Sequence, residues 1–295
     1  MKKSLKKAIS LFPITEQILI YVALICFKLR LKVPQSAAVL FSSCNDYVRM
    51  TEQAVDFTKE SKELIKASLF INQHPITVFL RRLSSDRHVL ESVLLHEEYK
   101  VAAEKLQANN HVEDKVIIDA GGNIGLTTIY LHSFFPKAKF VIIEPDENNA
   151  ALLEKNLQAN EIQSATVTRK ALWISNEKLV LDHSFRDGKE WSISVGKINS
   201  DSTQVNDHQI EGINLQEICL INGIQHIDLL KIDIEGAERF LFVNDSFLQT
   251  VSKHAKHLVI EIHDEFKIRE TINQKMLQLG FTRAEQGDVT LFAKQ

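Results

Sequence analysis

Short apolar runs alternate with amphipathic stretches along the chain from Val112 onward. The apolar runs are rich in β-branched residues and span 115–119, 138–144, 165–173, 227–233 and 257–263. The stretches between them that have helical spacing span 126–135, 147–160, 236–242 and 268–279. Two β-like runs, near Phe281 and at 289–293, end the pattern. Alternation of this kind is typical of a parallel sheet with crossover helices, so it predicts an α/β fold.

The first 110 residues have a different pattern. Residues 1–67 contain few glycines and helix-compatible runs such as 52–69, which predicts a helical N-terminal extension. Residues 68–110 contain a strand-like run at 76–80, a polar turn and a helical run at 89–106. We therefore divide the chain into a helical extension (1–67), a strand–helix lead-in (68–110) and the α/β domain (111–295).

The amino terminus combines four lysines within residues 1–7 with a ten-residue apolar run at 18–27. Crossing a bilayer takes about 20 apolar residues, and the polar or helix-interrupting residues at 13 and 15–17 prevent a longer run. No small-residue cleavage signature follows the run. We expect a helix that packs on the body of the protein. A basic surface helix that contacts the inner face of a membrane and a true membrane anchor stay open as alternatives.

Composition narrows the class of protein. The chain has 295 residues, of which 44% are hydrophobic and 25% charged, and this excludes collagen-like and wholly disordered proteins. A net charge of −3 gives no support to a nucleic-acid partner held by bulk charge. Three cysteines without CxxC spacing favour a reducing compartment and disfavour a zinc site. We expect a cytoplasmic protein.

A glycine-rich loop, Asp119-Ala120-Gly121-Gly122-Asn123-Ile124-Gly125, lies directly after a buried strand and before a helix. Glycines there allow a tight turn and close approach of a ligand. A dinucleotide fingerprint starting at 119 would need glycine at 119, 121 and 124, which this sequence does not have. A carboxylate at Asp119 disfavours a pyrophosphate and suits an ammonium or a sulfonium. S-adenosylmethionine carries both of these groups.

Glu144 ends the second strand, 25 residues after Asp119. An acid in this place accepts hydrogen bonds from ribose hydroxyls, in NAD as well as in S-adenosylmethionine, so it indicates adenosine. Pro145 and Asp146 then open the next helix. Short-chain dehydrogenases need a Tyr-x-x-x-Lys pair. None of the four tyrosines here has a lysine four residues later, which disfavours such a dehydrogenase.

Acidic residues and one histidine follow two later strands. Asp233 and Glu235 come after the fourth strand, and His263 ends the fifth, where a pKa near 6.5 would suit a general base. Glu261 shares the side of the strand with His263, and Glu238 is expected on the exposed face of a helix. We expect no metal site, although a magnesium shell of Asp233, Glu235 and His263 stays open.

These motifs resemble those of the FkbM-type S-adenosylmethionine-dependent methyltransferases. The matching segments are 116–125, 143–145, 228–238 and 259–263, with 84–86 and 96–99 similar to the family's lead-in; together they lie within residues 76–293. The stretch Lys231-Ile232-Asp233-Ile234-Glu235-Gly236-Ala237-Glu238 is the most specific part. Gly122 stands where the family often has alanine, which we expect only to loosen the turn.

The resemblance implies a Rossmann-like class I methyltransferase fold, with a doubly wound seven-stranded sheet whose last strand is antiparallel. It implies S-adenosyl-L-methionine as cofactor and O-methylation of a hydroxyl on a sugar, glycolipid or natural product. The residues that it assigns to the cofactor are Asp119, Gly121, Gly122, Asn123, Gly125, Glu144, Pro145, Ala171 and Asp233. Within this set Glu144 would bind ribose, Ala171 would lie near adenine and Asp233 would border the methyl group. His263, Asp233 or Glu235 would take the hydroxyl proton.

Other functions stay open from the sequence. One is a module that binds an adenosine ligand without catalysis, and another is an NAD-dependent oxidoreductase. The polar stretch 182–214, with Phe185 and Trp191, is expected to cover the acceptor. We expect a small-molecule, glycan or lipid-linked acceptor, no nucleic acid, and either no membrane contact or a peripheral one through the N-terminal helix.

Overall fold

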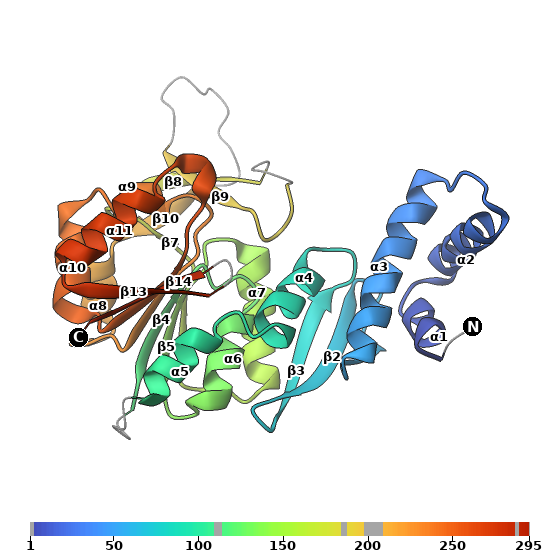
Figure 1. The fold of residues 1–295 in the computed structure, drawn as a ribbon, viewed down its shortest axis with the longest axis horizontal. Coiled ribbons are helices and arrows are strands. Elements are labelled where there is room, and N and C mark those ends of the chain that lie inside the picture. The colour runs from blue at the N-terminus through green and yellow to red at the C-terminus, as the bar shows by residue number, and fades with distance from the viewer. Residues whose placement is uncertain (1–2, 109–113, 184–187, 198–208, 287–288, 295) are drawn as a thin grey trace. The chain divides into compact units, whose positions relative to one another are not determined.

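The computed structural model describes residues 3–108, 114–183, 188–197, 209–286 and 289–294. The chain divides into two compact units, Met1–Leu95 and His96–Gln295, and each is described by itself. Figure 1 shows the elements of both units. Among the described residues, no helix is both long enough and apolar enough to cross a membrane.

The first unit combines three helices with a small antiparallel sheet. Its elements are α1 (Lys3–Ser10), α2 (Ile14–Leu29), α3 (Gln35–Glu52), β1 (Asp56–Lys59), β2 (Leu64–Ile71), β3 (His74–Arg81), α4 (Asp86–Leu90) and a π-helical turn (Glu91–Leu95). The sheet order is β1-β2-β3. The helical prediction for 1–67 was therefore wrong beyond Glu52. Alternate residues of β2, from Ile65 to Ile71, are buried, and this period of two makes the segment a strand.

The second unit is built on a seven-stranded sheet. Its elements in chain order are α5 (Lys100–Ala108), β4 (Val116–Ala120), α6 (Leu126–Phe134), β5 (Lys139–Ile143), α7 (Glu147–Ala159), β6 (Ala165–Thr168), β7 (Ala171–Leu172), β8 (Lys178–Asp182), β9 (Ser194–Lys197), β10 (Gln209–Ile213), α8 (Leu215–Ile221), β11 (Leu229–Ile232), α9 (Glu238–Leu241), α10 (Asp245–His254), β12 (His257–Glu261), a 3₁₀ turn (Asp264–Phe266), α11 (Arg269–Gln278), β13 (Phe281–Gln286) and β14 (Val289–Lys294).

The strand order of this sheet is β13-β14-β12-β11-β4-β5-β6. Neighbouring strands from β12 through β6 are parallel, and β14 is antiparallel to both β12 and β13. This confirms the predicted fold class, including the antiparallel last strand. Helices cover both faces, with α6 and α7 on one side and α8, α10 and α11 on the other (Figure 1).

The strand order reverses direction around β4, since the chain first adds β5 and β6 on one side and later β11 and β12 on the other. Ligands of open α/β sheets bind at such a switch point, outside the carboxyl ends of the strands. The predicted glycine loop follows β4, Glu144 follows β5 and Asp233 follows β11. The fold therefore brings these three segments to one edge.

A second, four-stranded sheet in the order β7-β10-β8-β9 lies beside this edge. The single strand predicted over 165–173 is in fact two strands, because β6 pairs with β5 in the large sheet and β7 pairs with β10 in the small one. Parts of the stretch 182–214 form β9 and β10. Residues 184–187, with Phe185, and 198–208 lie outside the described residues.

Candidate functional site

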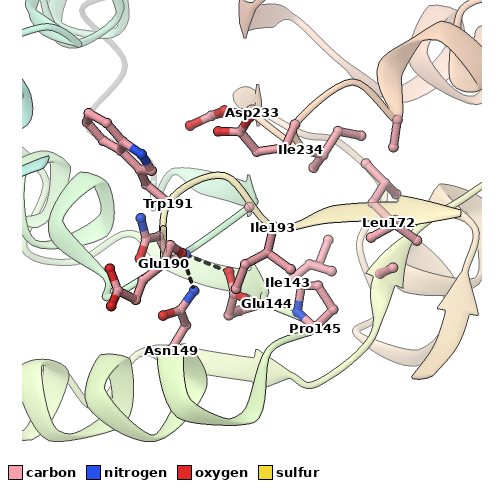
Figure 2. A pocket seen from close by; sticks show the side chains of 16 residues that line it. Ile143, Glu144, Pro145, Asn149, Leu172, Glu190, Trp191, Ile193, Asp233 and Ile234 are labelled. Atoms are coloured by element: carbon pink, nitrogen blue, oxygen red, sulfur yellow. Dashed lines mark hydrogen bonds between the residues drawn. The ribbon is translucent and has the colours of Figure 1, made fainter. Parts of the chain in front are cut away.

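A pocket opens where β4, β5 and β11 end, and its empty space, counted together with the adjoining open solvent, is about 550 Å³ (Figure 2). Among the described residues that line it, four are acidic and none is basic. The acidic residues are Glu144, Glu190, Asp233 and Glu235. Figure 2 shows Asp233 on the opposite side of the pocket from Glu144. Such a lining favours a ligand that carries positive charge.

The glycine loop forms the floor between β4 and β11. The backbone N–H groups of Gly121 and Gly122 donate to the carbonyl oxygen of Ile143, at 2.9 and 3.1 Å. Gly121 has φ +82°, and a Cβ at this position would lie 1.6 Å from the carbonyl oxygen of Asp233. Only glycine lets the loop pack this closely on the end of β11.

Gly122 is also tightly enclosed, which corrects the expectation that glycine in place of alanine only loosens the turn. A Cβ at Gly122 would lie 2.3 Å from Cγ2 of Ile142 and 2.9 Å from Cδ1 of Leu153. An alanine would need both side chains to shift. Gly122 and Gly125 thus shape the loop and do not line the pocket.

Asp119 lies behind the loop instead of facing the pocket. Its side chain is fully buried, and it accepts a hydrogen bond from the hydroxyl of Thr128 at 2.8 Å. Its other oxygen lies 3.2 Å from Nζ of Lys231. The carboxylate is thus committed to partners inside the protein, in contrast to the expectation that it meets the ligand directly.

Lys231 is the functional residue that the sequence reasoning missed. Its buried ammonium donates to the carbonyl oxygen of Gly121 at 2.6 Å and lies 3.6 Å from Asp233. Burial lowers the pKa of Lys231, but the carboxylates of Asp119 and Asp233 outweigh it, so the net shift is upward. Lys231 therefore ties the loop to β11 as a permanent cation. A lysine inside the apolar run of β11 was the available signal.

Glu144 holds the position predicted for a ribose ligand. One carboxylate oxygen accepts the N–H of Asn123 at 2.7 Å, and the other accepts the N–H of Asp146 at 2.9 Å. Burial raises the pKa of Glu144 to about 8, although these two hydrogen bonds and Lys231 oppose the shift. A carboxylate has about four acceptor positions, so capacity is left for hydroxyl donors.

The remaining walls are mainly apolar. Pro145, Leu172 and Ile193 line one side, and Trp191 lies at one end (Figure 2). Ala171 also lines the pocket. Nδ2 of Asn149 donates to the backbone oxygen of Glu190 at 3.0 Å and so fixes the segment that carries Trp191. The apolar walls suit a flat aromatic base.

His263 is enclosed by carboxylates. Its Nδ1 contacts Glu238, and its Nε2 lies 3.4 Å from Glu235 and 3.9 Å from Glu261. Burial lowers the pKa of His263, but the hydrogen bonds to Glu235 and Glu238 dominate and raise it to about 11. The raised pKa favours the protonated imidazolium, whereas the prediction of a general base relied on an ordinary pKa near 6.5.

The prediction of an exposed Glu238 was wrong. Its side chain is fully buried and accepts hydrogen bonds from the backbone N–H of Gly236 at 2.9 Å and of His263 at 3.2 Å. Because α9 has only four residues and begins at Glu238, the side chain is turned back toward β12. Burial and the nearby Asp233 raise the pKa of Glu261. This cluster lies behind the pocket wall formed by Asp233 and Glu235.

One group of side chains has the composition of a cation site. One ligand atom each of Asp233, Glu261 and His263 lies within 4.8 Å of the other two. This set differs from the alternative considered from the sequence, since Glu261 replaces Glu235.

The structure thus brings most of the predicted site residues to one pocket. Gly121, Asn123, Glu144, Pro145, Ala171, Asp233 and Glu235 line it. Asp119, Gly122, Gly125 and His263 lie behind its walls. The loop geometry also fits an ammonium-bearing ligand, because Oδ1 of Asn123 is buried and has no hydrogen-bond partner among the described residues.

Comparison with known proteins adds independent information. The model of the FkbM methyltransferase domain matches residues 119–283. The 2-O-methyltransferase NoeI of Sinorhizobium fredii is 29% identical over 136 residues, which cover 42% of this chain and 55% of that protein. Methyltransferase 1 of Beauveria bassiana is 23% identical over 141 residues, which cover 43% of this chain and 56% of that protein. The chain therefore spans little more than half the length of these relatives.

Among solved structures, the chain is similar to magnesium protoporphyrin IX methyltransferase from Synechocystis PCC 6803, which was determined with bound SAM. The TM-score is 0.39 at 12% identity, and the similarity covers 68% of this chain and 79% of the other.

Proposed function

The chain belongs to the FkbM methyltransferase family, and from this membership we propose that it transfers a methyl group to a hydroxyl of a sugar, a glycolipid or another natural product. S-adenosylmethionine is the cofactor of the family. The related NoeI is a 2-O-methyltransferase, which supports oxygen as the methyl acceptor. The acceptor is a small molecule or a glycan or lipid carrier.

One observation carries the proposal: Glu190, Asp233 and Glu235 line the pocket beside Glu144, whose pKa is raised, and no basic side chain is among its described lining residues. The negative potential of these side chains stabilises a bound cofactor that carries a sulfonium and an ammonium, and it repels the pyrophosphate of NAD. The lining therefore disfavours the oxidoreductase alternative.

Different residues of the chain would bind different parts of the cofactor. Glu144 would accept hydrogen bonds from the ribose hydroxyls, and the free Oδ1 of Asn123 would accept one from the ammonium. Ala171 and Leu172 would contact the adenine face. Asp119 would act indirectly, because it holds Lys231, which in turn holds the carbonyl of Gly121.

S-adenosylmethionine, when bound, supplies a methyl group made electrophilic by the sulfonium. The protein would contribute alignment of the acceptor hydroxyl, which is a large source of rate in such reactions. Asp233 lines the pocket and is partly exposed, so it is placed to accept the hydroxyl proton. His263 would hold Glu235 and Glu238 in place as a cation instead of acting as the base.

The test uses S-adenosylmethionine labelled in its methyl group and fractions of a cell extract. We expect label in an acceptor that keeps it after mild alkali, since methyl ethers survive conditions that hydrolyse methyl esters. Asp233→Asn should lower kcat by 100-fold or more and change the dissociation constant of S-adenosylhomocysteine by less than about threefold.

Three outcomes contradict the proposal. Tight cofactor binding without transfer to any fraction would indicate a binding module. Alkali-labile label would indicate methylation of carboxylates. Binding of reduced nicotinamide would favour the oxidoreductase.

A further inference from the structure

Helix α2 exposes a continuous apolar stripe. Ile14, Ile18, Tyr21, Ile25 and Leu29 are all exposed, from 43% at Tyr21 to 76% at Ile14. Their spacing of four, three, four and four residues places them on one face of the helix. Large apolar side chains gathered in this way on a surface mark a site of interaction.

The opposite side of α2 is already used within its own unit. Ile20 and Ala23 are buried, and the rings of Phe27 and Phe41 lie 5.1 Å apart between α2 and α3. Glu16, the acidic residue of α2, pairs with Arg82. The helix is therefore held in position by these contacts while its apolar stripe faces outward.

Positive charge is concentrated in the segment of the chain that contains the stripe. Residues 1–32 contain seven lysines and arginines and one acidic residue, in a chain whose net charge is −3. Lys28, Arg30 and Lys32 flank Leu29, the last residue of the stripe, and are exposed, as are Lys3 and Lys6 on α1. Charge of this sign is thus concentrated around the most exposed apolar helix face of the unit.

An anionic lipid surface matches both features. The stripe would enter the boundary between headgroups and acyl chains, and the basic side chains would meet anionic headgroups. A second copy of the chain would match the apolar stripe but would place like charges against each other. With 16 residues, α2 is shorter than a membrane-spanning helix and would lie in the plane of the interface.

We propose that α2, with Lys28, Arg30 and Lys32, is a docking surface for an anionic lipid bilayer. The inference does not rest on the proposed methyl transfer. It places the protein at a membrane surface as a reversible peripheral binder, because one surface helix with an exposed apolar stripe and a basic flank gives weaker binding than a spanning helix.

The test is flotation of the full chain with phosphatidylcholine vesicles that contain either no phosphatidylglycerol or about 30% of it. We expect binding to the anionic vesicles that falls at least tenfold in 0.5 M salt and at least tenfold on neutral vesicles. The double variant Ile18→Ser/Ile25→Ser should lose tenfold or more in partitioning, and Lys28→Glu/Arg30→Glu should lose a similar factor.

Leu220→Ser is the matched control, because Leu220 is 77% exposed and lies on α8 of the other unit. It should bind vesicles as the unaltered protein does, and circular dichroism should show unchanged helix content in all variants.

Equal binding by the stripe variant and the unaltered protein would overturn the proposal, as would absence of binding to anionic vesicles. A dimer in solution that the Ile18→Ser/Ile25→Ser change dissociates, without vesicle binding, would assign the surface to a second copy of the chain.

Discussion

The protonation state of Glu144 should control how tightly the cofactor binds. Burial raises the pKa of this carboxyl to about 8, so most of it is protonated at pH 7 in the ligand-free protein. Ribose hydroxyls that donate to both oxygens favour the ionised form. Binding should therefore expel a proton, and affinity should rise with pH until Glu144 is ionised before the ligand arrives.

The size of the effect follows from the pKa. With a value near 8, roughly one hundredth of Glu144 is ionised at pH 6, roughly one tenth at pH 7 and about half at pH 8. If only the ionised form binds ribose, affinity should rise about tenfold from pH 6 to pH 7 and about fivefold from pH 7 to pH 8. The tenfold step corresponds to about 1.4 kcal/mol.

The assay is calorimetric titration with S-adenosylhomocysteine at pH 6, 7 and 8, in buffers that differ in ionisation enthalpy. We expect release of about 0.9 proton per ligand at pH 7. Glu144→Gln mimics the protonated carboxyl in shape and charge. The variant should bind more weakly than the unaltered protein already at pH 6, and its affinity should not change with pH, so the difference should widen about tenfold from pH 6 to pH 7 and about fivefold from pH 7 to pH 8.

Two results would refute this reasoning. Affinity that is constant from pH 6 to pH 8, without proton release, would mean that Glu144 is already ionised or does not meet the ribose. An equal pH dependence in the unaltered protein and in Glu144→Gln would assign the titration to a different group, since the nearby charges on Asp146 and Lys231 also act on this site.

Four further predictions address the loop, the buried charges and the cation question. The unfolding free energy of Gly121→Ala, measured in urea, should be at least about 3 kcal/mol lower than that of Gly280→Ala. Both glycines have φ +82°, but only a Cβ at position 121 would meet a backbone oxygen, at 1.6 Å. Lys231→Met should cost about 3–5 kcal/mol of unfolding free energy, and adding Asp119→Asn should restore part of it, since the lone buried carboxylate is then removed. The raised pKa of His263 means that its protonated side chain stabilises the folded protein. This contribution is complete below about pH 6.5 and is lost as pH rises through about 11. The stability difference between the unaltered protein and His263→Gln should therefore shrink by up to about 1.4 kcal/mol per pH unit in that window, measured by denaturant unfolding at pH 7, 8 and 9. Methyl transfer should stay within about twofold after treatment with EDTA; a loss that Mg²⁺ or Mn²⁺ restores would place a cation among the acidic side chains.

The α/β unit was predictable because its strands are local apolar runs separated by helical spacing. The N-terminal strands were not, since Leu64–Ile71 is both helix-compatible and strand-compatible in isolation. Its pairing with His74–Arg81 decided the outcome, because each strand supplies the hydrogen-bond partners of the other. The small sheet was missed for a similar reason, since β7 has only two residues and pairs with a strand some 40 residues later.

The sequence by itself determined which residues meet, because parallel strands bring their carboxyl ends to one edge and Gly121, Glu144 and Asp233 each follow such an end. Only the tertiary structure decided what these groups do. Burial and the identity of neighbouring side chains depend on packing between segments that are distant in the sequence. This packing pairs Asp119 with Lys231, buries Glu238 against His263 and raises the pKa of Glu144. The spacing of these residues in the sequence does not specify the distances between their charged groups, and electrostatic interactions depend directly on those distances.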